Sequence, residues 1–402
     1  MKKTTKILLG ATASVAVIGA LSVQHLIKPA TQEMYQGYII THHANFMVDV
    51  VNQAGGTNKF IHTRELPTEG TDNVVTPALD HIYSKAVLQL TDGPVFFTTP
   101  KVANDRYFSF QLTDQEHYTI MDKYHPEGEF AVVRAGTDYS AAIERVGAEN
   151  VIVSPSDYPH LFIRVQVYTP DATAEVYPIQ DALKIDAPTS KESMEYVKTA
   201  PVQWVLETHD VPEKNITQLT RVSDFSQFDY KVTHLKVGVR YLSGAVEVLD
   251  NTGLFDHIDY ASENHERRAI GVIGHLGFQT GHAIYQPWRS NNKGDTLNGS
   301  TPHVITLPYD ANVDHFWSVT RYDGKTRNTY ARQNDVFNAY NTLPDENGNI
   351  TITFASEQVE DGSYWMPVHD GKEYYYIVRY YGAHKVSNMS RPFNFNIQTA
   401  SY

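Results

Sequence analysis

The chain has 402 residues, no cysteine and a formal net charge of −13. This acidity, without a dense Lys/Arg run beyond the extreme N-terminus, argues against a nucleic-acid-binding surface. Without cysteine there is no disulfide and no thiolate nucleophile, and any metal would need His and carboxylate ligands. The 26 Tyr and 17 Phe are typical of half-buried pleated surfaces, so we expect a mainly β protein with some helix.

The first 23 residues have the pattern of a secretory signal peptide. Lysines precede an uncharged, mostly apolar run over residues 7–23, and Ala20 to Ser22 offers small residues for cleavage. An uncleaved anchor is the alternative, although the run is short and only mildly hydrophobic for a span. The pattern predicts a periplasmic or secreted protein with a linker over residues 24–36 and no membrane span after cleavage.

Residues 37–175 have the pattern of a β-rich domain that opens with a helix. Apolar residues recur at helical spacing over residues 37–53. Further along, apolar residues alternate or cluster between turn signals, which predicts strands at residues 85–90, 93–100, 106–114 and 160–168. In the last two of these we expect one face to point inward: Phe108, Phe110 and Leu112, and Leu161, Ile163, Val165 and Val167. Ser109, Gln111, Phe162 and Arg164 are among the residues expected on the opposite face.

Residues 176–284 change to helical spacing, and residues 285–402 return to strands. Helices are expected within residues 190–210, 224–249 and 262–277, the last with Ser262 as N-cap and Gly277 as its end. In the C-terminal part, strands are expected at residues 315–323, 348–354 and 373–381. This order predicts an N-terminal β domain, a helical connecting region and a C-terminal β-sandwich domain.

Standard catalytic motifs are missing from the chain. It has no HExxH, no GxSxG, no Walker loop and no GxGxxG after a strand. The adjacent pair His42 and His43 lies on the predicted helix, where neighbouring side chains diverge by about 100°, so one metal ion is poorly served. We therefore expect neither a bound metal nor a cofactor.

Three arginines, Arg164, Arg321 and Arg379, interrupt alternating strands. Each would lie either on a solvent-exposed sheet face or on a concave face that holds a small anion or a sugar, because the guanidinium fork pairs with carboxylates in a bidentate way.

The C-terminal part resembles the bacterial domain of unknown function DUF1214. The residues that carry the resemblance are Phe316-Trp317-Ser318, Arg332, Asn347-Gly348, Trp365-Met366-Pro367 and Arg379-Tyr380-Tyr381, with Arg268-Ala269 and Tyr285 upstream. Phe316 and Trp317 are neighbours on a strand and should therefore face opposite sides of it.

The N-terminal part resembles the partner domain of unknown function DUF1254. The matching positions are Pro77, Asp80, Tyr83, Ser84, Gly93, Pro94, Arg106, Tyr107, Gln111 and Asp114. The chain departs from that pattern where Ala78 or Leu79 replaces a usual Asn and where His81 replaces a usual Thr. The two resemblances imply two β-sandwich, jelly-roll-like domains with helices between them, and they imply no particular reaction.

Three hypotheses for function follow. The leading one is an exported protein that binds a small polar molecule or carbohydrate in a cleft lined by Arg and aromatic residues. Its candidate site residues are Asp80, Tyr83, Arg106, Arg268, Trp317, Arg332, Trp365 and Arg379. The second is a hydrolase or lyase that uses Asp80 with Tyr83 or a nearby His. The third is an envelope structural or assembly protein, and the sequence leaves a homo-oligomer open.

Overall fold

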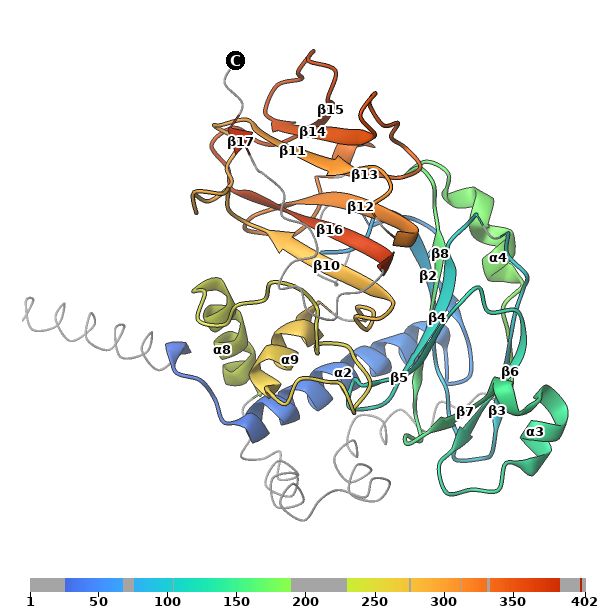
Figure 1. The fold of residues 1–402 in the computed structure, drawn as a ribbon. Coiled ribbons are helices and arrows are strands. Elements are labelled where there is room, and N and C mark those ends of the chain that lie inside the picture. Colours follow the sequence, from blue (N-terminus) through green and yellow to red (C-terminus); the bar gives the residue numbers. More distant parts are fainter. Residues whose placement is uncertain are drawn as a thin grey trace, which may run out of the picture.

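A computed structural model describes residues 26–67, 76–103, 105–188, 230–274, 276–311, 313–330, 333–383 and 398–399. The protein is mainly β and has two domains, each built from two packed sheets, with helices beside them (Figure 1). The expected signal peptide and the helix expected within residues 190–210 lie outside the described residues, as does Arg332.

The N-terminal domain is a sandwich of a five-stranded and a four-stranded sheet. The first sheet has the order β1 (Ile61–His62), β2 (His81–Val87), β8 (His160–Gln166), β4 (Phe108–Thr113) and β5 (Thr119–Tyr124). The second has the order β7 (Val151–Ser154), β6 (Gly128–Arg134), β3 (Val95–Thr99) and β9 (Lys184–Asp186). Short helices α3 (Ser140–Val146) and α4 (Tyr177–Asp181) and turns η1 (Ala148–Asn150) and η2 (Thr173–Val176) complete it. Because β9 pairs with β3, this sandwich extends beyond the expected boundary at residue 175.

The core of the N-terminal sandwich confirms the predicted inward faces of β4 and β8. Phe108, Phe110 and Leu112 are fully buried there, and Phe110 packs at 5.3 Å from both Phe97 and Phe130 of the facing sheet. The outer face of β4 and β8 is buried as well, because other parts of the protein cover it and keep it from water. Alternation alone does not reveal this.

The C-terminal domain is a sandwich of two four-stranded sheets. One has the order β10 (Ala283–Trp288), β16 (Tyr374–Ala383), β12 (Val313–Asp323) and β13 (Val336–Asn338). The other has the order β15 (Tyr364–Pro367), β14 (Asn349–Ala355), β11 (His303–Pro308) and β17 (Gln398–Thr399), and turn η3 (Gln333–Asp335) precedes β13.

The rings of Phe316 and Trp317 face opposite sides of β12, as predicted. Trp317 lies in the core of the C-terminal sandwich, and its indole N–H donates to the Tyr309 carbonyl at 2.7 Å. Phe316 stacks on Tyr381 at 4.3 Å on the other face, which turns toward the N-terminal domain. Arg321 shares the Trp317 face, pairs with buried Asp335 and is fully buried, so it supports the core.

Three helices lie beside the sandwiches: α2 (Gln32–Ala54), α8 (Tyr230–Leu242) and α9 (His265–Ile273). The α2 helix begins at Gln32, inside the expected linker over residues 24–36, because Thr31 accepts from the Met34 N–H as N-cap. The N-cap of α9 is Asn264 rather than Ser262, since the Asn264 side chain accepts from the next two N–H groups. The same helix ends at Ile273, before the expected Gly277.

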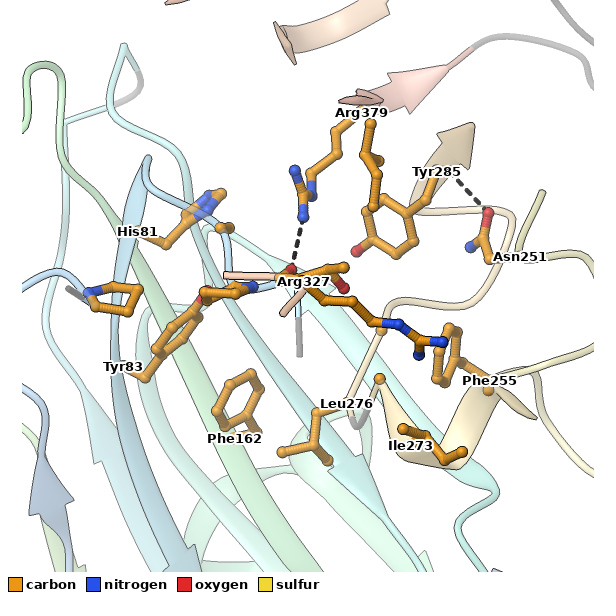
Figure 2. A pocket seen from close by; sticks show the side chains of 18 of the residues that line it. His81, Tyr83, Phe162, Asn251, Phe255, Ile273, Leu276, Tyr285, Arg327 and Arg379 are labelled. Carbon is orange, nitrogen blue, oxygen red and sulfur yellow. Dashed lines mark hydrogen bonds between the residues drawn. The ribbon is translucent and has the colours of Figure 1, made fainter. Parts of the chain in front are cut away.

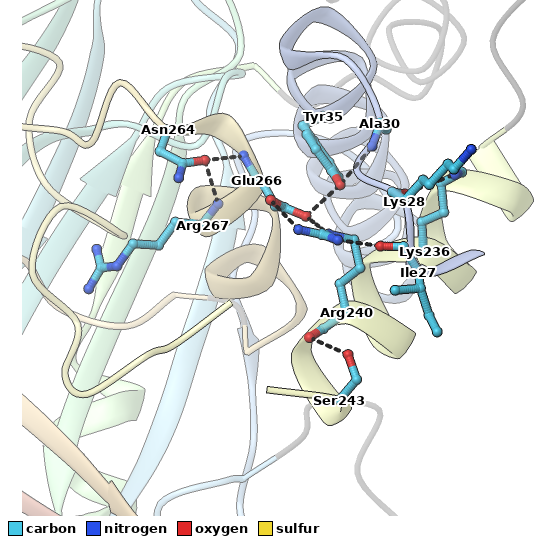
Figure 3. Close-up of polar contacts among 10 residues, drawn as sticks. All are labelled: Ile27, Lys28, Ala30, Tyr35, Lys236, Arg240, Ser243, Asn264, Glu266 and Arg267. Atoms are coloured by element: carbon cyan, nitrogen blue, oxygen red, sulfur yellow. Dashed lines mark hydrogen bonds and ion pairs between the residues drawn. The ribbon is translucent and has the colours of Figure 1, made fainter. Parts of the chain in front are cut away.

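A buried carboxylate joins these three helices (Figure 3). Glu266 of α9 accepts a hydrogen bond of 2.6 Å from the Tyr35 hydroxyl of α2 and pairs with Arg240 of α8. The Tyr35 oxygen in turn accepts from the Ala30 N–H at 2.9 Å. The helices are therefore fixed to one another by charge as well as by apolar contact. None of the helices in the described part of the chain is long and apolar enough to cross a bilayer.

Candidate ligand-binding cavity

A cavity of about 560 Å³ lies between the two sandwiches (Figure 2). One wall comes from β2 and β8 of the N-terminal domain, and the facing wall comes from β10 and β16 of the C-terminal domain. The end of α2, the segments at residues 61–67, 76–78 and 248–255, and the end of α9 close the remaining sides. A cavity of this size suits a small organic molecule.

The C-terminal wall follows from the alternation of β16. Its even-numbered residues 374 to 380 pack into the sandwich core, and the odd-numbered residues Tyr375, Ile377, Arg379 and Tyr381 line the cavity. The neighbouring strand β10 adds Tyr285 opposite Arg379 and Pro287 opposite Ile377. The β16 part of this wall is therefore aromatic and aliphatic, with Arg379 as its cation.

The N-terminal wall is the outer face of β2 and β8. Tyr83 and Phe162 stack, with 4.9 Å between their ring centres, and form an aromatic surface on this wall. The Lys85 ammonium and the Arg164 guanidinium lie beside this aromatic surface, at 5.8 Å and 4.4 Å from the Phe162 ring. The face of β8 that alternation places opposite the sandwich core therefore forms a cavity wall. Aromatic rings and cations lie next to one another on this wall.

Arg379 is held by neutral partners. Its Nη1 donates to the Thr320 hydroxyl at 3.1 Å, and its Nη2 donates to the Tyr322 hydroxyl at 2.8 Å and the Thr76 carbonyl at 2.9 Å. Burial lowers the pKa of Arg379, but Tyr322, Tyr381 and Asp80 outweigh that effect and raise it. The side chain is therefore a fixed cation that is 5% exposed. It forms no ion pair with any carboxylate in the part of the chain that the structure describes.

Arg164 is the second buried cation at the cavity. Its Nη2 donates to Gln111 Oε1 at 3.0 Å and to the Leu276 carbonyl, and its guanidinium lies 3.7 Å from the centre of the Phe278 ring. Its Nη1 is buried and has no hydrogen-bond partner among the described residues. It likewise forms no ion pair there, so its charge is stabilised by dipoles and rings alone.

Asp80 and His81 form a close pair, with His81 on the cavity wall and Asp80 behind it. His81 Nδ1 lies 2.8 Å from Asp80 Oδ1, and both side chains are buried. Burial alone raises the pKa of Asp80, but His81, Arg379 and Ser318 outweigh it, so the pKa lies below its ordinary value. Burial, with Arg164 and Arg379, lowers the pKa of His81 more than Asp80 raises it. The part of the cavity near Asp80 therefore holds one carboxylate, the neutral imidazole of His81 and the guanidiniums of Arg164 and Arg379.

Another part of the cavity lining is apolar. Leu254, Ile270, Ile273 and Leu276 line it, together with the Phe255 ring. Gly277 permits this close packing, since a Cβ there would lie 2.2 Å from the Phe255 ring. A ligand would therefore meet both cations and hydrocarbon in the cavity lining.

The sequence-predicted site residues fall into separate places. Tyr83 and Arg379 line the cavity, and Asp80 lies behind it against His81. Arg106 instead pairs with Glu175 at 3.0 Å, and Arg268 stacks on Tyr118 at 3.7 Å and donates to the Glu116 carbonyl. Trp317 fills the C-terminal core, and Trp365 donates to the Ala355 carbonyl at 3.0 Å. The last four are therefore not on the cavity wall, and Arg332 lies outside the described residues.

Several cavity residues were not among the predicted site residues. Arg164 interrupts an alternating strand in the same way as Arg379, so the strand pattern could have identified it as a candidate site residue. Arg289 follows β10 and Arg327 lies in the turn after β12, and no local pattern distinguishes either from a surface arginine. His81 is visible only as a departure from the DUF1254 pattern.

The histidine pair of α2 diverges, as the helix geometry predicts. His42 Nδ1 is 2.7 Å from the Tyr230 hydroxyl, whereas His43 packs 4.8 Å from His117 on another side. Among the described residues, no group of three or more His and carboxylate side chains is placed to hold a metal ion.

Residues 57–187 match the family model described as protein of unknown function DUF1254, and residues 282–385 match the model described as protein of unknown function DUF1214. The chain combines a DUF1254 domain with a DUF1214 domain. Both resemblances seen in the sequence are thereby confirmed. In this DUF1254–DUF1214 protein, the cavity lies between the two domains, with one main wall from each.

Among solved structures, the VPA0106 protein from Vibrio parahaemolyticus is similar, with a TM-score of 0.64 and 17% identity over 94% of this chain and 100% of that one. A putative uncharacterized protein from Burkholderia cenocepacia aligns with a TM-score of 0.44 and 13% identity over 95% of this chain and 96% of that one. The first similarity shows the fold alone. No curated protein matches the chain.

Proposed function

We propose that this DUF1254–DUF1214 protein binds a small organic anion in the cavity between its domains. The ligand would have an acidic group, such as a carboxylate, and an apolar body. The acidic group would lie near Arg379 and Arg164, and the body would lie on the Tyr83 and Phe162 rings and against the aliphatic side chains of the lining.

The observation that carries the proposal is the pair of buried guanidiniums that have no ion-pair partner among the residues that the structure describes. Arg164 and Arg379 are 4% and 5% exposed, and one buried carboxylate, Asp80, lies near Arg379 without forming an ion pair with it. Burying a cation without an ion pair is unfavourable, and an incoming anion would offset that cost. The same charges favour an acid over a neutral sugar as ligand.

Isothermal titration calorimetry with probe ligands tests the proposal. Benzoate and octanoate should bind, and benzyl alcohol and octanol should bind at least about tenfold more weakly, since they lack the charge. Arg164→Gln and Arg379→Gln should each lower the affinity for the anions by about tenfold or more.

Arg106→Gln is the matched control, because Arg106 lies in the same domain but pairs with Glu175 away from the cavity. It should leave anion affinity unchanged. Equal affinity for the acids and the alcohols, or equal losses in all three variants, would contradict the proposal.

A second candidate function is acid–base catalysis on the bound molecule, favoured by the contact between His81 and Asp80. The carboxylate would orient the imidazole, as in other His–carboxylate pairs. Both ring nitrogens of His81 are covered by protein, however, so we rank binding first. A hydrolase would turn over 4-nitrophenyl esters of the acids that bind, and His81→Gln would abolish turnover. Binding without turnover in the unaltered protein would contradict the catalytic proposal and leave binding as the remaining function.

We also propose that the protein acts outside the cytoplasm, on the basis of the signal-peptide pattern at residues 1–23. N-terminal sequencing of protein from the native host should begin between about residues 23 and 32. Recovery of intact Met1 in the membrane fraction would instead indicate an anchor.

A further inference from the structure

We infer that the ligand carries two anionic groups, held at opposite ends of the cavity, so that the preferred class is an elongated dicarboxylic acid. The inference rests on the proposed function, because it concerns the same cavity. It comes from a second pair of cations, Arg289 and Arg327, that neither domain pattern identifies.

The first step is the register of the C-terminal wall. Tyr285 of β10 lies opposite Arg379 of β16, and Pro287 lies opposite Ile377. Continuing the same register, Arg289 comes level with Tyr375, and its guanidinium lies 4.2 Å from the centre of that ring. Arg379 and Tyr375 are four residues apart on one strand face, which corresponds to about 13 Å. The wall thus presents a cation, an apolar row and a second cation.

The second step is how the outer cations are held. The Arg289 Nη2 donates to the Tyr241 hydroxyl at 3.0 Å, and the Arg327 guanidinium lies 5.0 Å from the centre of the same Tyr241 ring. Both arginines line the cavity, and neither forms an ion pair with a carboxylate among the residues that the structure describes. Two like charges around one ring repel each other, and an anion between them would reverse that repulsion.

The third step is that Arg327 is held in place by its turn. The Arg327 N–H donates to the Asp323 carbonyl at 3.0 Å, and the Asp323 side chain accepts from the N–H groups of Lys325 and Thr326. Arg327 has a φ of 63°, a left-handed conformation that residues other than glycine seldom adopt. Its carbonyl accepts from Thr76, which shares this unusual geometry with a φ of 58°. Such strained positions concentrate at binding sites, where the surrounding structure maintains them.

The carboxylates around the cavity do not neutralise the outer pair. Asp250 also lines the cavity, and its Oδ1 lies 3.7 Å from Arg267, which is not a cavity residue. Asp49 and Glu65 come from α2 and from the segment at residues 61–67, on the N-terminal side of the cavity with Lys85. The C-terminal wall therefore keeps a positive charge at each end of an apolar stretch.

The experiment compares octanedioate with octanoate by isothermal titration calorimetry on the full chain. The two probes share one chain length and differ in the second carboxylate. The unaltered protein should bind octanedioate about tenfold more tightly than octanoate, a typical gain for one further charge-assisted contact. Arg289→Gln and Arg327→Gln should each bring this ratio toward one by weakening the binding of octanedioate more than that of octanoate.

Arg289→Lys serves as the matched variant, since it keeps the charge and should keep most of the preference for octanedioate. Circular dichroism spectra confirm that each variant is folded. Equal affinity for the two probes in the unaltered protein would overturn the inference, as would a preference that survives both Gln substitutions. Failure of both probes to bind would instead contradict the proposed function itself, so the two failures are distinguishable.

Discussion

Arg379 donates a hydrogen bond of 2.9 Å to the carbonyl of Thr76, a residue 303 positions earlier in the chain. One residue lies on a strand of the C-terminal sandwich, and the other lies in the segment that leads into β2 of the N-terminal sandwich. The neighbouring Tyr322 hydroxyl reinforces this connection by donating to the Pro77 carbonyl at 2.6 Å. The same guanidinium thus lines the cavity and joins the two domains.

Arg379→Ala should lower the free energy of unfolding by about 3 kcal/mol, because it removes three hydrogen bonds and leaves Asp80 buried with less compensation. Urea denaturation monitored by circular dichroism measures the change. Arg145→Ala is the control, since Arg145 forms ion pairs with Glu129 and Asp186 on the surface and should change stability by less than about 1 kcal/mol. Similar losses in both variants would contradict this account of Arg379.

Breaking the Arg321–Asp335 pair should affect stability without affecting binding. Both side chains are fully buried in the C-terminal domain, away from the cavity. Asp335→Ala should therefore lower the free energy of unfolding by about 3–5 kcal/mol, since it leaves an uncompensated buried cation. Below its reduced unfolding transition, the variant should bind octanoate with unchanged affinity. A loss of affinity in the folded variant would show that Arg321 influences the ligand.

Stability should fall as the pH decreases below about 6.5, the ordinary pKa of histidine. Burial lowers the pKa of His43 to about 3 and lowers the pKa values of His117 and His160 well below the ordinary value. In this window the unfolded chain binds protons that the folded chain excludes, so the stability present at neutral pH is progressively lost on acidification.

The measurement is urea denaturation at pH 7, 6 and 5. His160→Phe keeps a ring against Phe46 and Phe162 and should reduce the slope by up to about 1.4 kcal/mol per pH unit. A slope that His160→Phe does not change would mean that this histidine titrates alike in both states.

Tyr35→Phe should destabilise the helices beside the cavity by about 1–2 kcal/mol, because Glu266 loses a short hydrogen bond and the Ala30 N–H loses its acceptor. Glu266→Gln should cost more, since it also leaves the Arg240 guanidinium without its carboxylate. Native-state hydrogen exchange would measure the effect in α2, α8 and α9. Uniform loosening of both sandwiches, without a larger effect in the helices, would contradict a local role for Glu266.

Period-two alternation was enough to predict strands at β4, β8, β12 and β16 and the inward faces of β4 and β8. It also separated Phe316 from Trp317, because neighbours on a strand must point to opposite sides. Alternation does not specify what covers the strand face that points away from the sandwich core. Arg164 would show the same pattern beside water, beside a ligand or beside another domain, so its burial was not predictable from the strand alone.

The candidate site was harder to predict, because its residues come from segments far apart in the chain. Arg327 approaches the cavity only because the Asp323 turn directs it there, and Tyr241 reaches it from a helix between the domains. Conversely, Arg106 and Arg268 match the family patterns but are occupied by Glu175 and the Glu116 carbonyl. Matching a family pattern indicated which residues matter to the fold, and it did not distinguish the residues that face the cavity.

The placement of the cavity between two domains has a consequence for how such proteins diverge. Under the proposed function, neither sandwich would carry a complete set of contacts for the ligand, since Arg164 belongs to one and Arg379 to the other. A substitution that enlarges one wall changes which molecules the other wall must accommodate. Exchange of a whole domain with a distant relative would bring together halves that had adapted to different molecules. The two sequence segments are therefore expected to be inherited together and to change their ligand preference in concert.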